Sequence, residues 1–187
     1  MPEDNIPKTR GQSAASKSDG IGRGVIAYIA LGSNLGDRLN FLRRGRIGLE
    51  AHGVRILTSS AVYSTEPVGG PQEQQDYYNA VLQVEVDCTA LELLKICQTV
   101  EQAAGRERRE RWGARTLDID VLLFGTQRIN TKTLQVPHPR MFERRFVLEP
   151  LAQIAPTLVP SNRTQDIVST LQRLPETPRV RKEQHSW

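Results

Sequence analysis

The amino-acid sequence predicts a single α+β domain in which strands and helices follow the order βαββαβ. Short apolar runs rich in β-branched residues alternate with longer segments of helical periodicity. The 187 residues are enough for one domain with a substantial core. Residues 1–24 are polar and lack aromatic residues, so we expect a disordered extension there. The domain then covers residues 25–174, and a flexible tail covers 175–187.

Four segments have the composition of strands. Each is an apolar run with β-branched members, and in the third, valines alternate with acidic residues, as in a strand with one buried face. A long loop rich in Gly, Pro and Gln, residues 66–76, separates the second strand from the third. The four segments are VIAYIALG (25–32), VRILTSSAVYST (54–65), NAVLQVEVD (79–87) and RTLDIDVLLF (115–124).

Two segments between these strands have the periodicity of amphipathic helices. Asn34 or Asp37 can cap the first helix, which runs to about residue 52. Thr89 begins the second helix, and Gly105 ends it. The resulting order is that of a ferredoxin-like fold, in which helices cover one sheet face and the other face is free to hold a ligand. An additional C-terminal part is predicted, with a hairpin near 126–130, an extended segment over 136–140 and helices near 140–153 and 164–174.

Composition restricts the kinds of protein that the chain can be. No apolar run approaches the roughly 18 residues of a membrane span, and no apolar segment resembling a secretory signal precedes the domain. We therefore expect the protein to be located in the cytoplasm. Cys88 and Cys97 lack a zinc-binding spacing and are expected to be reduced thiols. The net charge of +4 suits an anionic ligand or nucleic acid without choosing between them.

Two aspartates occupy the last predicted strand. Strand side chains alternate between faces, so Asp118 and Asp120 share one face, with Cβ atoms roughly 6–7 Å apart. Two like charges beside apolar neighbours repel each other unless a cation joins them. Five arginines lie just upstream, at positions 106, 108, 109, 111 and 115. Arginine forks suit phosphate oxygens and carboxylates suit Mg²⁺, so this region favours a metal–polyphosphate site over a solvated charged surface.

At this point the chain resembles the 6-hydroxymethyl-7,8-dihydropterin pyrophosphokinases of folate biosynthesis. The resemblance covers about residues 25 to 160, and it departs from the family's pattern at Ala114, where Pro is usual, and at Phe142, where a polar residue is common. Four blocks carry it in the family's order: YIALGSNLGDR (28–38), STEPVGGPQEQQDYYNAV (64–81), GRERRERWGARTLDID (105–120) and VPHPRMFERRFVLEPL (136–151).

The resemblance implies transfer of the β,γ-pyrophosphoryl unit of ATP to the hydroxymethyl group of a reduced pterin, with release of AMP. Asp118 and Asp120 would bind two Mg²⁺ ions together with ATP, and Arg106 and Arg115 would stabilise the charged transition state. The remaining residues implied for ATP are Gln98, Glu101, Arg108, Arg111, Trp112, Val121, His138 and Arg144. Without the resemblance, Gln98 and Glu101 are ordinary helix-surface residues and Val121 is a core valine.

For the pterin, the resemblance implies a sandwich between Tyr77 and Phe146. Asn79 and Thr65 would read the ring edge. Backbone groups near Val68 would help, and Trp112 would close over the site. Taken singly, the two sandwiching aromatic residues are equally explained by core packing. The expected partners are the two small substrates, with neither nucleic acid nor membrane, and the chain is expected to be a monomer.

Two other functions use some of the same residues. A nucleotidyltransferase also combines Gly-Ser with Asp-x-Asp, but there the Gly-Ser precedes the carboxylates by about ten residues, whereas Ser33 and Asp118 are 85 apart. An RNA-binding module would use the basic segment 106–115, yet the aromatic motif typical of such modules is missing from the sequence. The reaction products distinguish the first alternative, because a pyrophosphokinase gives AMP and a pyrophosphorylated acceptor, whereas a nucleotidyltransferase gives pyrophosphate and a nucleotidylated acceptor. Salt-sensitive RNA binding without ATP binding would indicate the second alternative.

Overall fold

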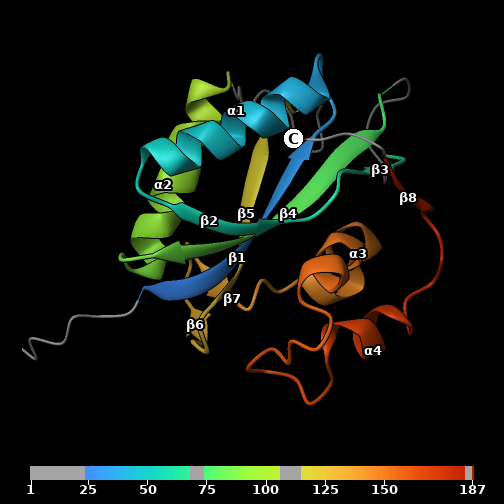
Figure 1. Ribbon diagram of the computed structural model, residues 1–187. Coiled ribbons are helices and arrows are strands. Elements are labelled where there is room, and N and C mark those ends of the chain that lie inside the picture. The colour runs from blue at the N-terminus through green and yellow to red at the C-terminus, as the bar shows by residue number, and fades with distance from the viewer. Residues whose placement is uncertain (1–23, 68–73, 106–114, 184–186) are drawn as a thin grey trace, which may run out of the picture.

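The computed structural model describes residues 24–67, 74–105, 115–183 and 187, and shows an antiparallel sheet with helices on both faces (Figure 1). The predicted extension therefore lies, except for Gly24, outside the described residues. The same holds for several predicted site residues: Val68, Arg106, Arg108, Arg111 and Trp112.

The main sheet has the strand order β5-β1-β4-β3-β8, and β2 also pairs with β4. Its centre is β1 (Val25–Ser33), which pairs antiparallel with β4 (Tyr77–Val86) and with β5 (Asp118–Phe124). The remaining strands are short: β2 (Arg55–Ser59), β3 (Tyr63–Thr65) and β8 (Val180–Lys182). The predicted strands are thus present, in a sheet whose central strands lie next to partners distant in sequence.

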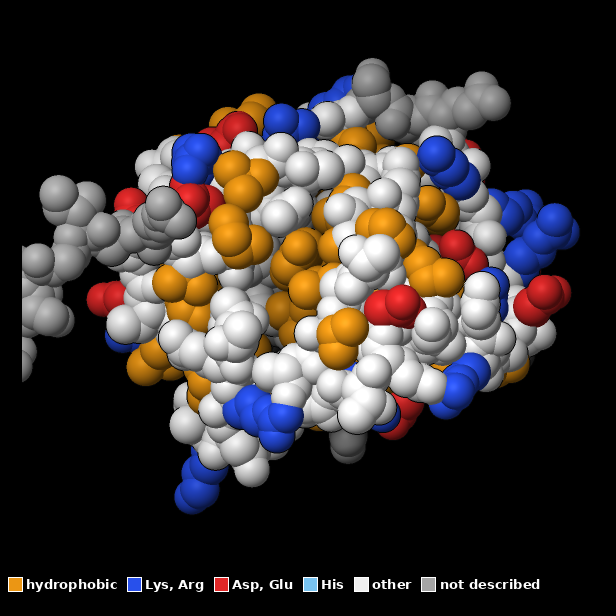
Figure 2. All heavy atoms as spheres, turned by 60° about the horizontal axis from the view of Figure 1, so that its bottom comes forward, with side chains coloured by type: hydrophobic (Ala, Val, Ile, Leu, Met, Phe, Trp, Pro, Cys, Tyr) orange, Lys and Arg blue, Asp and Glu red, His pale blue; other side chains and the backbone are white. Residues whose placement is uncertain are grey.

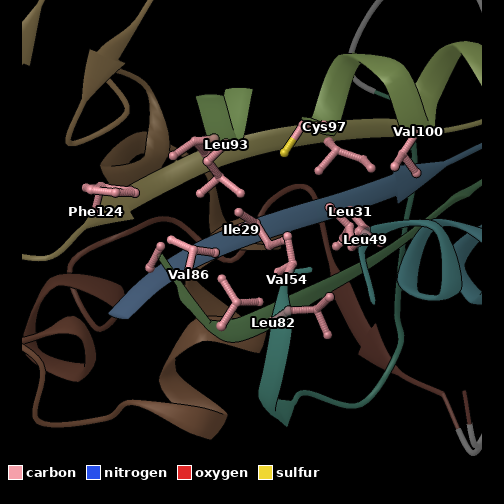
Figure 3. Close-up of a cluster of buried hydrophobic side chains, with 14 of the residues drawn as sticks. Ile29, Leu31, Leu49, Val54, Leu82, Val86, Leu93, Cys97, Val100 and Phe124 are labelled. Atoms are coloured by element: carbon pink, nitrogen blue, oxygen red, sulfur yellow. The ribbon is translucent and has the colours of Figure 1, made fainter. Parts of the chain in front are cut away.

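Two helices cover one face of the sheet, α1 (Arg38–Ala51) and α2 (Ala90–Ala103). Asp37 caps α1 and a capping box at Thr89 begins α2, as predicted. The main core cluster lies between these helices and the sheet (Figure 3). A Cβ atom at Gly48 would lie 2.9 Å from Val100 Cγ1, so glycine, though unfavourable in a helix, lets α1 approach α2 closely.

The two cysteines lie in and beside this core. Cys97 is buried in the main cluster and Cys88 is half-buried, and both are free thiols. Burial, with a further contribution from Glu101, raises the pKa of Cys97 to about 12, so its thiol stays protonated near neutral pH.

The opposite face of the sheet is partly covered, which corrects the expectation that it is free. A 3₁₀ turn, η1 (Met141–Glu143), leads into α3 (Arg145–Ile154), and α4 (Ile167–Leu171) packs beside α3. These elements enclose a second apolar cluster with Tyr28, Val81 and Leu122 of the sheet. In the direction of view of Figure 2, apolar side chains gather in the middle of the surface and charged ones lie mainly towards its margins.

Three further elements differ from their predictions. The single strand predicted over 54–65 is two strands, because Ser60 leaves the ladder and its hydroxyl accepts a hydrogen bond from Val81 N at 2.9 Å. The helix predicted near 140–153 is interrupted at Arg144, whose backbone is extended. The hairpin strand β6 (Ile129–Asn130) pairs with β7 (Gln135–Val136) in a separate two-stranded sheet.

The flexible tail predicted over 175–187 is also corrected, because it contains strand β8, which pairs with β3. The sequence RVRK carries no alternation of apolar and polar residues that would have predicted a strand. Within the described part of the chain, no helix is both long and apolar enough to cross a membrane. The cytoplasmic location and the monomeric state remain predictions from the sequence.

Candidate active site

A cavity of about 320 Å³ opens on the sheet face that carries α3. Its floor comes from the end of β1 and the starts of β4 and β5, and its walls come from β3, η1, α3 and the chain after α4. It brings together eight of the predicted site residues: Thr65, Tyr77, Asn79, Arg115, Asp118, Asp120, Arg144 and Phe146.

The alternation of β5 places both aspartates at this cavity, as predicted. Asp118 pairs with Gly32 and Asp120 with Ala30 across the β1 ladder. These neighbours carry no side chain beyond a methyl group, so space remains beside the carboxylates. Ile119, between them, points to the opposite face and into the main core.

Arginines contact both carboxylates. Arg115 Nη1 donates to Asp118 Oδ2 at 2.6 Å, whereas Arg144 Nη1 lies 3.9 Å from Asp120 Oδ2. Burial, followed by repulsion from Asp118, raises the pKa of Asp120, although His138, Arg144 and Arg115 oppose the rise. The arginines therefore compensate only part of the negative charge, and a further cation at this point would be stabilised.

His138 interacts electrostatically with Asp120 and is not among the described residues that line the cavity. Its backbone N–H donates to Leu122 O at 2.8 Å, which fixes it beside β5. Burial lowers the pKa of the imidazole, assisted by Arg144 and Arg140 and opposed by Asp120. The ring is therefore neutral near pH 7, and because its Nδ1 accepts from Arg140 N at 3.2 Å, the proton sits on Nε2.

An aromatic and amide group occupies the other part of the cavity. Tyr77 and Asn79 point to the same face from β4, and Tyr77 pairs with Thr65 of β3. Asn79 Nδ2 donates to Thr65 Oγ1 at 3.3 Å, which holds the two polar side chains together. Phe146 enters from the first turn of α3, with the Arg144 guanidinium 5.6 Å from its ring centroid. The cavity thus combines polar edge groups with two aromatic rings.

Besides His138, three further predicted residues lie outside the described lining of this cavity. Gln98 is exposed on α2, and Val121 is part of the main core. Glu101 is only 3% exposed, and its Oε1 accepts the backbone N–H of Ile119 at 2.7 Å. The carboxylate of Glu101 therefore holds β5 from the helix side, directly between the two aspartates, while all three residues stay predictions for nucleotide binding.

The prediction missed one residue that organises the site. Asn34, 1% exposed, accepts the Arg115 N–H on its Oδ1 at 2.8 Å and donates from Nδ2 to Gln74 Oε1 at 2.8 Å. Its own N–H donates to Arg115 O at 3.1 Å. Asn34 thereby fixes the backbone that carries Arg115. The only sequence signal was an Asn directly after a strand in GSNLGD, which also suits a helix cap.

Paired carboxylates, arginines and two aromatic side chains in one cavity are typical of an enzyme that acts on a phosphorylated substrate. The family model for 7,8-dihydro-6-hydroxymethylpterin-pyrophosphokinase matches residues 28–156. The chain belongs to that family, and it is an ATP-dependent pyrophosphokinase of folate synthesis. Membership decides against both the nucleotidyltransferase and the RNA-binding alternatives.

Relatives of similar length support the assignment. The chain is 47% identical over 130 residues to the 2-amino-4-hydroxy-6-hydroxymethyldihydropteridine pyrophosphokinase of Bacillus subtilis (strain 168), covering 69% of this chain and 77% of the relative. It is 42% identical over 139 residues to the enzyme of the same name from Haemophilus influenzae, covering 74% of this chain and 86% of the relative.

Solved structures show the same fold at low identity. An HPPK-DHPS crystal structure in complex with substrates matches with a TM-score of 0.64 at 14% identity, over 81% of this chain and 43% of that one. The Plasmodium falciparum HPPK-DHPS A437G structure matches with a TM-score of 0.62 at 13% identity, over 83% and 46%. The chain thus spans less than half the length of these HPPK-DHPS chains.

Proposed function

We propose that the cavity transfers pyrophosphate from ATP to 6-hydroxymethyl-7,8-dihydropterin, giving the pterin diphosphate and AMP. One observation carries the proposal: the paired aspartates of β5 and the aromatic residues Tyr77 and Phe146 line the same cavity. Such a cavity holds both reactants side by side, which lowers the entropic cost of their reaction. We also propose that the sheet core is ferredoxin-like, on the support of the order β5-β1-β4-β2 and the two connecting helices.

The residues at the aspartates fit Mg²⁺. Mg²⁺ is commonly held by one or two carboxylates together with substrate phosphates, and Asp118 and Asp120 of the cavity would be two such ligands. Burial and the neighbouring Asp118 raise the pKa of Asp120, which supports a cation beside this carboxylate. When bound, two Mg²⁺ ions would neutralise charge on the transferred phosphates.

The cationic side chains position the phosphates. Arg115 reaches the cavity from a backbone fixed by Asn34, and Arg144 reaches it because the chain is extended between η1 and α3. Neutral His138, with its proton on Nε2, is suited to donate a hydrogen bond to a phosphate oxygen. The arginines predicted at 106, 108 and 111 would complete the charge stabilisation, with Gln98, Glu101 and Val121 towards the nucleotide.

The pterin would lie between Tyr77 and Phe146, where stacking adds about 0.5–1.5 kcal/mol beyond area burial. Asn79 donates to Thr65, which leaves its Oδ1 to accept from the amino edge of the ring. A Cβ atom at Gly32 would lie 3.3 Å from this Oδ1, so glycine keeps the space beside it open. Val68 and Trp112 are predicted to contribute from loops outside the described residues.

Incubation with Mg-ATP and the reduced pterin, followed by chromatography, tests the proposal. AMP and a pterin diphosphate should form in equal amounts, and EDTA should stop their formation. Release of inorganic pyrophosphate with a nucleotidylated product would contradict the proposal. A control variant is Asp87→Asn. Asp87 follows β4 and is not among the described residues that line the cavity, so this substitution should leave AMP formation unchanged.

A further inference from the structure

A segment near the C-terminus forms one wall of the cavity. Residues 174–182, here called the C-terminal strap, contribute Leu174, Pro175, Thr177 and Pro178 to the lining. The strap lies beyond residues 28–156, the part of the chain that the family model matches. The sequence predicted only a flexible tail for nearly all of it.

The first residue of the strap is fixed to the start of α3. Arg145 Nη1 donates to Leu174 O at 3.2 Å, and Arg145 Nη2 pairs with Glu149 Oε1 at 2.9 Å. Phe146, one side of the ring slot, is the next residue along α3. The strap and Phe146 are therefore held by the same helical turn.

The last residues of the strap are fixed to β3. Strand β8 pairs with β3 so that Val180 lies opposite Thr65, and beyond it Glu183 N donates to Val62 O at 2.8 Å. Without β8, the three residues of β3 would form a sheet edge with unpaired backbone groups. The strap therefore also steadies the strand that presents Thr65 to the cavity.

Farther along, Trp187 contacts helix α1 and the segment between β2 and β3. Trp187 Nε1 donates to Ser60 O at 2.8 Å, and Arg46 Nη1 donates to Trp187 O at 2.9 Å. Its ring packs against the main core cluster. The strap itself is tied at Leu174 and at β8, and Pro175 and Pro178 restrict the backbone between these ties.

The sheet order separates the strap from the aspartates. Strand β5 lies at one edge and β8 at the other, with β1, β4 and β3 between them. The strap thus borders the part of the cavity formed by Thr65 and Phe146. A wall at this position meets a flat ring and not the phosphates held near β5.

We propose that the C-terminal strap is a specificity-determining wall of the pterin slot, which limits the size of the reduced pterin that enters and takes no part in nucleotide binding. The inference rests on the proposed function, because it assumes that the ring lies between Tyr77 and Phe146. It assigns to the strap a contribution to KM for the pterin and to discrimination between pterins of different size.

The decisive variant is Thr177→Trp. Thr177 is exposed and lines the cavity, so a larger side chain there narrows the slot without removing a core contact. We expect KM for the pterin to rise about tenfold or more. KM for ATP should stay within about twofold, and the melting temperature should not change. Thr157→Trp, at an exposed threonine outside the described lining of the cavity, is the matched control and should alter neither KM.

A second variant enlarges the slot. Thr177→Gly should accept a reduced pterin carrying an additional alkyl group better, relative to the parent pterin, than the wild type does. An unchanged KM for the pterin in Thr177→Trp, or an equal rise in the KM values for pterin and ATP, overturns the inference about the strap. The proposed function is retained in that case if the wild type forms AMP. A wild type that forms no AMP from both substrates overturns the proposed function and the inference with it.

Discussion

The two faces of strand β5 differ in what they bury. Towards α1 and α2, Ile119 and Val121 are each 3% exposed and belong to the main core. Towards α3, Asp118 and Asp120 line the cavity beside Arg115 and Arg144. Neighbouring residues of β5 therefore lie in different environments: Ile119 in the apolar core, and the aspartates in a cavity that holds two like charges.

This difference shows how a strand can serve stability and chemistry separately. Because side chains alternate, the apolar face can be packed at core density without occupying the space above the carboxylates. The packing of that face supplies free energy that offsets the repulsion between the aspartates. Glu101 strengthens the separation by binding the backbone of Ile119 from the core side.

The strongest test replaces the cavity face. Asp118→Ala or Asp120→Ala should lower kcat by roughly 10³-fold or more, because each removes a predicted metal ligand. The folded state should remain, and Asp120→Ala should unfold at an equal or higher temperature, since a desolvated carboxylate is lost. Steady-state kinetics and thermal unfolding measure the two effects. Retained activity with a strongly lowered melting temperature would show that the aspartates are structural.

The matching test replaces the core face. Ile119→Ala should lower the free energy of unfolding by about 2–5 kcal/mol, because it leaves a cavity in packed core. Ile119→Val, the milder control, should cost about 0.5–1.5 kcal/mol. Denaturant unfolding measures both values, and kcat at a temperature where the variants are folded should stay within a few-fold of wild type. A loss of kcat as large as that of the aspartate variants would mean that the two faces are not separable.

Alternation of side chains is a local property, which is why the sequence predicted the aspartate pair, its shared face and the strand that carries it. The caps at Asp37 and Thr89 are local in the same sense and were also predicted correctly. Helical periodicity places Glu101 on a face but does not say which backbone group its carboxylate will meet. That partner, Ile119 N, is 18 residues away and is set only by packing of α2 on β5.

Features that depend on distant partners were missed for the same reason. Asn34 contacts Gln74 and Arg115, which are 40 and 81 residues away. Strand β8 is three residues long and forms because β3 offers an open edge. The break at Arg144 interrupts an otherwise regular helical pattern, yet it aims the guanidinium at Asp120. Neither composition nor periodicity predicts which distant residues will come into contact.

A smaller effect on stability is expected at Glu101, whose carboxylate binds the backbone of β5 between the two aspartates. Glu101→Ala should lower the free energy of unfolding by about 1–3 kcal/mol, because the buried Ile119 N–H loses its acceptor. Glu101→Gln keeps an oxygen acceptor and should lose less. Gln98→Ala, at an exposed position one turn earlier, is the control for stability. KM for ATP in the same variants tests the predicted role of both residues in nucleotide binding. A changed KM for ATP with an unchanged free energy of unfolding would show that Glu101 serves nucleotide binding and not stability.

The smallest expected effect is a dependence of stability on pH at the cavity face. Burial lowers the pKa of His138 in the folded protein below its ordinary value of 6.5, with Arg144 and Arg140 acting in the same direction and Asp120 and Asp118 against it. The unfolded chain then binds a proton at pH values where the folded chain does not. Stability contributed by the neutral ring is therefore present above pH 6.5 and is lost as pH falls from 6.5 towards the folded pKa.

His138→Gln should remove this part of the pH dependence, so that its free energy of unfolding changes less than that of the wild type between about pH 7 and pH 5. His52→Gln, at an exposed histidine that ends α1 on the helix-covered side, is the control for replacing a histidine by glutamine. Denaturant unfolding at several pH values gives the slopes directly. Because Asp120 has a raised pKa, its protonation stabilises the fold as the pH falls, opposite in sign to the effect at His138. Asp120→Asn should therefore steepen the loss of stability on acidification, and a wild-type slope in both His138→Gln and Asp120→Asn would show that neither group titrates differently in the folded chain.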